Sequence, residues 1–303
     1  MKRRHFIKQS ATASALLVAG SYGLSAFSSV SERKHLTILH TNDTHSRFDP
    51  FPETDARFPN KGGIARRATL IERIRKENPN TLLLDAGDYF QGTPYFNFYG
   101  GELELKLMSK LRYDAATIGN HEFDNGLNGL LAQLPHANFP IISSNYDFSN
   151  TVLDGYVKKY RTFEKDGIKV GVFGLGVELE GLVTKKLYQE TKYYDPIEIS
   201  QDITKILREE ENCDMVICLS HIGYSYEHDK ISDVKLAAAT SGVDLILGGH
   251  THTFLPEPVI IKNKDEKDVM INQVGFAGIN LGRIDFYFEE SEKVTTEGMS
   301  LTV

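Results

Sequence analysis

The chain has 303 residues, 41% of them hydrophobic and 25% charged, which suits a folded globular protein and excludes a fibrous or disordered chain. Its formal net charge is −7, and the first 30 residues hold four basic and no acidic side chains, so the remainder carries −11. Such an acidic chain is poorly suited to bind a nucleic acid polymer, and it would repel small phosphate esters unless metal cations reversed the charge locally.

The first 30 residues have the pattern of a bacterial export signal. A basic segment with adjacent arginines, Met1–Lys8, precedes an apolar stretch of small residues from Ala11 to Ala19. Small residues at Ser25–Ser28 then offer a cleavage site. The Arg-Arg-x-Phe-Ile-Lys run is similar to twin-arginine signals, which are export addresses. We therefore expect an exported protein, periplasmic or extracellular, whose folded domain comprises residues 31–303.

From residue 36 onward, short apolar runs alternate with segments whose apolar residues recur every three or four positions. The apolar runs predict β-strands at Leu36–His40, Thr81–Asp85, Ala115–Ile118, Ile141–Ser144, Lys169–Gly174, Met215–Ser220 and Leu245–Gly248. The periodic segments predict helices at Ile64–Lys76, Glu102–Leu111, Gly126–Leu134, Glu198–Glu211 and Val234–Ser241. Further strands are predicted near the end, at Pro258–Ile261, Val269–Val274 and Arg283–Phe288. This alternation is typical of a layered α/β domain.

Side chains that can bind metals or protons follow five of the predicted strands. In chain order these are Asp43 and His45, then Asp88, then Asn120, His121 and Asp124, then His221, and finally His250 and His252. Each motif alone is also compatible with a structural role, such as a turn aspartate that caps backbone amides. Because α/β sheets tend to place ligands beyond the carboxyl ends of their strands, we expect these side chains to share one site.

The chemistry of this set points to divalent metals. Carboxylate, imidazole and amide donors without thiolate suit Mn²⁺, Zn²⁺, Fe²⁺ or Ni²⁺. Asp88 has two oxygens and can bridge two cations, while Asp124, three residues after His121, can orient that histidine. Two cations about 3.5–4 Å apart are a common device for phosphoryl transfer, because they activate water and neutralise developing charge.

The ordered motifs resemble those of the calcineurin-like metallophosphoesterases. The strings His40-Thr-Asn-Asp-Thr-His45, Asp85-Ala-Gly-Asp-Tyr-Phe-Gln-Gly-Thr-Pro94 and Gly119-Asn-His-Glu-Phe-Asp124 are most similar to the bacterial branch that contains 5′-nucleotidases, UDP-sugar hydrolases and 2′,3′-cyclic phosphodiesterases. The similarity extends from about Leu36 to Phe288. It implies a four-layer αββα sandwich and a catalytic domain at residues 31–303.

The resemblance also implies a role for each motif residue. One metal would be bound by Asp43, His45 and His252, the other by Asn120, His221 and His250, with Asp88 bridging the two. His121, oriented by Asp124, would stabilise charge at the phosphorus or protonate the leaving oxygen. The implied reaction is hydrolysis of a 5′-nucleotide, or another small phosphate ester, by a water that two divalent metals (Mn, Zn, Fe or similar) activate.

Three alternatives stay open at this point. The same ligands would serve a cyclic-nucleotide phosphodiesterase or a UDP-sugar hydrolase, because leaving-group contacts separate these activities. Longer members of the family carry a C-terminal domain that grips the nucleoside, whereas this sequence ends at Val303, so either the substrate range is broad or a separate polypeptide supplies that function. A non-catalytic binding module would be marked by lost ligands, and every motif residue is retained here.

Overall fold

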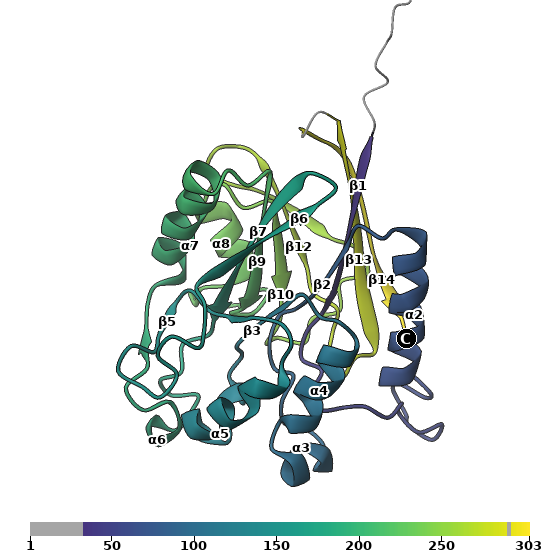
Figure 1. Cartoon of the computed structure of the whole chain (residues 1–303), viewed down its shortest axis with the longest axis vertical. Helices are drawn as coiled ribbons and strands as arrows, with labels where there is room; N and C mark the ends of the chain where they lie inside the picture. The colour runs from purple at the N-terminus through teal and green to yellow at the C-terminus, as the bar shows by residue number, and fades with distance from the viewer. Residues whose placement is uncertain (1–32, 290–291) are drawn as a thin grey trace, which may run out of the picture. The chain divides into compact units, whose positions relative to one another are not determined.

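Two six-stranded β-sheets form the centre of the structure, a computed structural model that describes residues 33–289 and 292–303 (Figure 1). The first sheet contains, in spatial order, β14 (Glu292–Thr302), β13 (Asn280–Glu289), β1 (Lys34–Thr41), β2 (Thr81–Asp85), β3 (Ala115–Thr117) and β4 (Ile141–Ile142). The second contains β11 (Val259–Lys262), β12 (Asp268–Asn272), β10 (Leu245–Gly248), β9 (Met215–His221), β7 (Ile168–Gly176) and β6 (Tyr160–Lys165). The export signal expected at residues 1–30 lies outside the described residues.

Four neighbouring strands run parallel in each sheet. They are β1, β2, β3 and β4 in the first sheet, and β7, β9, β10 and β12 in the second. The other strands, β13, β14, β6 and β11, pair antiparallel with their neighbours. Parallel neighbours end at the same edge of a sheet, so the loops after them are brought together there.

Both faces of the central strands are buried, which explains why they are continuous apolar runs. In β1, Leu36 and Ile38 pack between the two sheets, whereas Leu39 faces the helices that cover the first sheet. In β9, Ile217 packs between the sheets and Cys218 faces the helices on the second sheet. Side chains alternate in this way because successive residues of a strand point to opposite faces.

Helices cover the outer face of each sheet and complete four layers (Figure 1). The first sheet is covered by α2 (Ile64–Glu77), α4 (Glu102–Lys110) and α5 (Gly126–Gln133), and the second by α7 (Pro196–Lys205) and α8 (Asp233–Ala239). The predicted αββα order of layers is therefore confirmed. Among the described residues, no helix combines the length and apolar character needed to cross a membrane.

The central strands and covering helices lie where the sequence predicts them, whereas several peripheral elements differ. The helix predicted at Glu198–Glu211 begins earlier, at Pro196, because the Asp195 carboxylate accepts hydrogen bonds from the first amides of α7. Its last part is a separate π-helical turn, Ile206–Glu210. The short helices α3 (Pro94–Tyr99) and α6 (Lys185–Tyr188), and the strands β5 (Tyr146–Asp147), β6, β8 (Lys192–Tyr193) and β14, are not predicted.

Candidate metal centre

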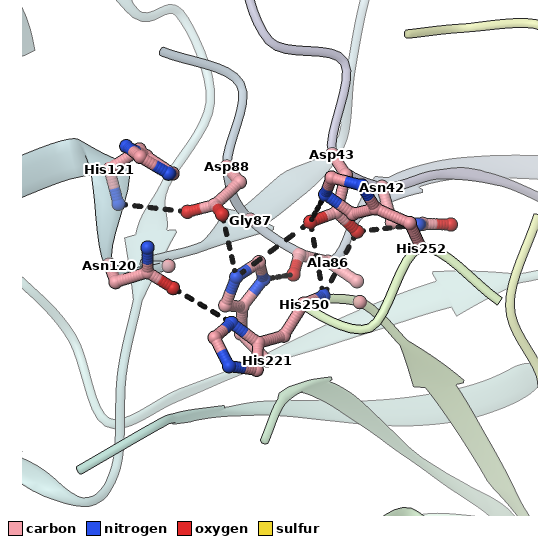
Figure 2. Close-up of polar contacts among 12 residues, drawn as sticks. Asn42, Asp43, Ala86, Gly87, Asp88, Asn120, His121, His221, His250 and His252 are labelled. Atoms are coloured by element: carbon pink, nitrogen blue, oxygen red, sulfur yellow. Dashed lines mark hydrogen bonds and ion pairs between the residues drawn. The ribbon is translucent and has the colours of Figure 1, made fainter. Parts of the chain in front are cut away.

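The loops after five strands meet at one place and bring the predicted ligands together (Figure 2). In chain order, Asp43 and His45 follow β1, Asp88 follows β2, Asn120 follows β3, His221 ends β9, and His250 and His252 follow β10. His121 begins the short 3₁₀ helix η1 (His121–Phe123), directly after Asn120. The chain separates Asp43 from His250 by 207 positions, yet the amide of His250 donates to both carboxylate oxygens of Asp43, at 3.0 Å each.

One group of ligand atoms consists of Asp43, His45 and His252. Asp43 Oδ1 lies 3.2 Å from His252 Nε2 and 3.8 Å from His45 Nε2. The two imidazole Nε2 atoms lie 3.0 Å apart. Two ring nitrogens and a carboxylate that point at one another in this way have the donor set of a divalent cation site.

A second group consists of Asp88, His221 and His250, with Asn120 beside it. Asp88 Oδ2 lies 3.0 Å from His221 Nε2, and His250 Nδ1 lies 2.9 Å from Asn120 Oδ1. In His221, Nδ1 donates to the carbonyl of Ala86 at 2.7 Å, so Nε2 is the nitrogen turned toward the carboxylates.

The environment of His221 tests whether a metal fits here. Its Nε2 is fully buried and makes no hydrogen bond of normal geometry within the described part of the chain. A buried polar atom left without a partner costs about 1–3 kcal/mol. A cation between this nitrogen and the carboxylate of Asp88 would satisfy both groups, so the residues present fit a divalent metal.

Asp88 belongs to both sides of the centre. Its ligand atoms also lie within 4.8 Å of those of His45 and His121, so the same carboxylate faces the first group as well as the second. His121 is held to it by its own backbone amide, which donates to Asp88 Oδ1 at 2.9 Å. The His121 ring lies 5.2 Å from the His45 ring, and its Nδ1 lies 2.8 Å from Asp124 Oδ2. The Asp88 carboxylate thus faces both groups of donors, and His121 pairs with Asp124, while the bridging role of Asp88 stays a prediction.

The backbone of the centre is strained. Five of the seven predicted ligands adopt a positive φ between 48° and 71°, namely Asp43, His45, Asp88, His250 and His252. This left-handed region is uncommon for residues with a side chain, and it costs about 1–3 kcal/mol per residue unless the surroundings impose it. This backbone conformation directs the ligand side chains of separate loops toward one site. In an extended strand, successive side chains would instead point to opposite faces.

Glycines allow these loops to approach one another. A Cβ atom on Gly119 would lie 2.7 Å from the amide nitrogen of Asp88 and 2.8 Å from His221 Nε2. A Cβ on Gly249 would lie 2.8 Å from His221 Nδ1. Both positions therefore need a residue without a side chain.

Glu122 supports the centre through hydrogen bonds to two loops, a role that the sequence alone does not predict. Its buried carboxylate accepts hydrogen bonds from the amides of Asp88 (3.0 Å), Phe90 (3.1 Å) and Gly119 (2.6 Å). It thereby joins the loop after β2 to the loop after β3. The only signal in the sequence is an acid beside His121, and that pattern does not show which amides approach it.

Asn42 and Gln273 hold the other loops. Asn42 Nδ2 donates to Asp43 Oδ2 and to the carbonyl of Gly275, each at 2.6 Å. Gln273 Nε2 donates to the carbonyl of Gly249 at 2.7 Å, which fixes the loop that carries both histidines after β10. Such supporting contacts orient metal ligands and affect metal affinity.

The pKa values of the histidines in the centre indicate which ring nitrogen a metal ion would compete for with a proton. Burial lowers the pKa of His221, but the carboxylates of Asp88 and Asp43 outweigh it and raise that pKa to about 10. Burial lowers the pKa of His250 to about 4, so this ring is neutral. The hydrogen bond to Asp124 raises the pKa of His121 to about 9. At neutral pH, His221 therefore holds a proton between two carboxylates, and a metal ion would have to displace it.

Comparison with protein families matches residues 36–254 to the calcineurin-like phosphoesterases. The chain belongs to this family. As the sequence motifs of this phosphoesterase predict, its groups of His and Asp side chains are positioned for metal binding.

The phosphoesterase is also similar to individual proteins. It is 37% identical over 300 residues to the trifunctional nucleotide phosphoesterase protein YfkN of Bacillus subtilis, a match that covers 88% of this chain and 19% of the relative. It is 34% identical over 285 residues to the 5′-nucleotidase of Homo sapiens, covering 86% of this chain and 47% of that relative. Its fold matches the 5′-nucleotidase precursor from Thermus thermophilus with a TM-score of 0.81 and 34% identity, covering 89% of this chain and 55% of that one. The phosphoesterase thus spans about half the length of these 5′-nucleotidases.

Proposed function

We propose that this phosphoesterase hydrolyses 5′-nucleotides to nucleoside and phosphate with two divalent cations. The observation that carries the proposal is the position of Asp88, whose carboxylate belongs to two neighbouring groups of oxygen and nitrogen donors. The similarity to several proteins named 5′-nucleotidase supports the choice of substrate.

The two groups divide the predicted ligands between two ions. Asp43, His45 and His252 would hold one cation, and Asn120, His221 and His250 would hold the other, with Asp88 shared between them. The donors are oxygens and imidazole nitrogens, which suit Mn, Zn, Fe or a similar ion. Two such cations would lower the pKa of a bound water and neutralise charge on the phosphate. They would also offset the acidity of the chain at the point where an anionic substrate binds.

His121 is placed to handle the leaving group. Because Nδ1 is directed at the Asp124 carboxylate, Nε2 is the ring nitrogen available to a substrate. The hydrogen bond to Asp124 raises the pKa of His121 to about 9, so the ring is protonated at neutral pH in the metal-free chain. The side chain is one-third exposed, so it can reach a bound ester. His121 would therefore hydrogen-bond to the phosphate or donate its proton to the leaving oxygen, while Asp124 holds the ring.

Other activities of the same site, a separate nucleotide-binding polypeptide and export of the chain are further parts of this proposal. A cyclic-nucleotide phosphodiesterase or a UDP-sugar hydrolase would use the same ligands, and the Bacillus subtilis relative is named a trifunctional nucleotide phosphoesterase. A separate nucleotide-binding polypeptide remains a hypothesis, motivated by the half-length match and supported by none of the comparisons. Export, through the signal pattern at residues 1–30, would place the reaction in the periplasm or outside the cell.

The test compares a monoester with a diester. The full chain is loaded with Mn²⁺ and assayed with 5′-AMP and with bis-p-nitrophenyl phosphate. Asp88→Ala removes the shared ligand, and Asp268→Ala serves as the matched control, because Asp268 is an exposed acid that pairs with Lys262 in the neighbouring strand. We expect 5′-AMP turnover that Asp88→Ala abolishes and Asp268→Ala preserves. A preference for the diester would reassign the chain as a phosphodiesterase, and inactivity on both with metal bound would overturn the proposal.

A further inference from the structure

Four phenylalanines extend from the metal centre to the protein surface. Phe276 stacks on the predicted ligand His252, with ring centroids 5.2 Å apart and an interplanar angle of 13°. Phe51, Phe58 and Phe254 surround Phe276 at centroid distances of 6.5, 5.7 and 6.0 Å. We refer to these four phenylalanines as the aromatic wall.

The aromatic wall is graded from buried to exposed. Phe51 is 9% exposed and packs with Ala277 and Ile279 in a small apolar cluster. Phe254 is 38% exposed, and its ring stacks with that of Phe58 at 5.8 Å and 24°. A partly exposed aromatic ring thus lies within two ring contacts of a predicted metal ligand, along the path from His252 through Phe276 to Phe254.

The exposed ring is held rigidly in place. Phe254 forms an isolated bridge with Val274, beside Gly275. A Cβ atom on Gly275 would lie 2.6 Å from Phe254 Cδ1, so the ring lies directly against bare backbone. Phe58 is fixed from the opposite segment, since the Asp55 carboxylate accepts a hydrogen bond from the Phe58 amide at 2.7 Å. A binding surface that is preformed loses little entropy when a ligand stacks on it.

Two arginines lie at the edge of the aromatic wall. The Arg47 guanidinium lies 4.0 Å from the centroid of the Phe51 ring, and the Arg57 guanidinium lies 5.1 Å from that of Phe58. Cations at this edge favour an electron-rich or anionic planar ligand. Hydrogen bonds from the Phe58 and Arg57 amides, together with the Arg47 and Arg57 guanidinium groups, lower the pKa of Asp55, so an acid lies beside these two cations.

We infer that the aromatic wall binds the planar ring of the substrate's leaving group, a nucleobase or a similar aromatic, while the phosphate lies at the metal centre. The inference rests on the proposed function, because it assumes that a phosphate ester binds beside His252. Contact with an exposed phenylalanine ring recognises bases of any kind and contributes affinity without hydrogen bonds. The chain would thus hold a nucleoside with residues of its own phosphoesterase fold.

The test separates the ring from the phosphate. 5′-AMP and ribose 5-phosphate share phosphate and sugar, and only the first has a base. In the Mn²⁺-loaded full chain, Phe254→Ala and Phe58→Ala should each raise KM for 5′-AMP about tenfold, as expected for loss of one stacking contact. Their kcat/KM for ribose 5-phosphate should stay within about twofold of the parent value. Phe98→Ala is the matched control, since Phe98 is 81% exposed on α3 and is not part of the aromatic wall.

Each other outcome has a definite meaning. Equal losses on both substrates would overturn the inference, because they would show that the rings only support His252. Unchanged KM for 5′-AMP in both variants would also overturn it. If the parent chain hydrolyses no phosphate ester, the proposed function fails by itself, and saturation-transfer NMR with adenosine then decides about the aromatic wall. Adenosine contact that Phe254→Ala removes would support a base site, and absence of contact in the parent would refute it.

Discussion

Gly119→Ala places one methyl group inside the metal centre and tests whether the geometry described for Asp88 is required. Gly119 does not have a positive φ, so alanine is compatible with its backbone and the effect is steric. The new Cβ would lie 2.7 Å from the amide nitrogen of Asp88 and 2.8 Å from His221 Nε2, and it would also overlap Asp88 Oδ1. The perturbation thus reaches two predicted ligands at once.

The size of the effect follows from these distances. Ordinary contact begins near 3.4 Å, so the Asp88 amide must move by about 0.7 Å, the difference between 3.4 and 2.7 Å, and the carboxylate by more. A displacement of about 1 Å at a reacting centre can cost about 100-fold in rate. Loss of ligand geometry should also weaken metal binding by about 10- to 100-fold. We expect kcat on 5′-AMP to fall about 100-fold, and stability to fall by about 1–3 kcal/mol from overpacking.

Gly171→Ala provides the matched control. Its Cβ would meet Leu207 Cδ2 at 2.9 Å and Cys213 Sγ at 3.0 Å, in the apolar layer outside the second sheet. This variant should lose a similar amount of stability while keeping its activity. The assays are steady-state phosphate release, titration calorimetry with Mn²⁺, and thermal unfolding of the metal-free chains. Retention by Gly119→Ala of both kcat and metal affinity within about threefold would refute the geometry, since the displacement argument requires a loss near 100-fold.

Further predictions concern the supporting residues and the metals. Asp124→Asn weakens the hold on His121, so kcat should fall by about 10- to 100-fold while calorimetric metal affinity is unchanged; a parallel loss of affinity would contradict a role confined to His121. Glu122→Gln places an amide donor opposite a backbone N–H donor, so the metal-free chain should lose about 2 kcal/mol of unfolding free energy. Denaturant unfolding measures this loss, and an unaltered midpoint would refute the structural role of Glu122. Mn²⁺ at 100 times its Kd should raise the unfolding free energy by about 2.7 kcal/mol, and a Tm indifferent to chelators would argue against a bound ion. Between about pH 6 and 8, Mn²⁺ affinity should rise about tenfold per pH unit, because Mn²⁺ must displace a proton from His221, whose pKa is raised to about 10. An Mn²⁺ affinity that calorimetry finds independent of pH would count against this competition.

Local sequence patterns were sufficient to predict the central strands and the residues that follow them. β2 at Thr81–Asp85 and β10 at Leu245–Gly248 have the predicted bounds, because strands buried on both faces are continuous apolar runs. Once the ends of these strands are known, Asp88 and His250 are placed at the edge where parallel strands present ligands. The positions of these side chains follow from the strand ends, whereas the assignment of each residue to a metal came from the resemblance of the ordered motifs and stays a prediction.

Edge elements were less predictable. β6 and β14 each lie at the edge of a different sheet, and their side chains are mostly half-buried or exposed where described. Such strands lack the apolar run that identifies a central strand, and they form because a neighbouring strand offers hydrogen-bonding groups. Pairing of this kind is a property of the assembled sheet rather than of the segment.

The sequence by itself determined which chemical groups this phosphoesterase can use and the order in which they occur. Only the tertiary structure decided that Glu122 accepts hydrogen bonds from the amides of two loops, and that Phe276 stacks on His252. Ligand identity depends on residue type, which a sequence records directly. Support and stacking depend on distances between segments far apart in the chain, and these exist only after the two sheets have packed together.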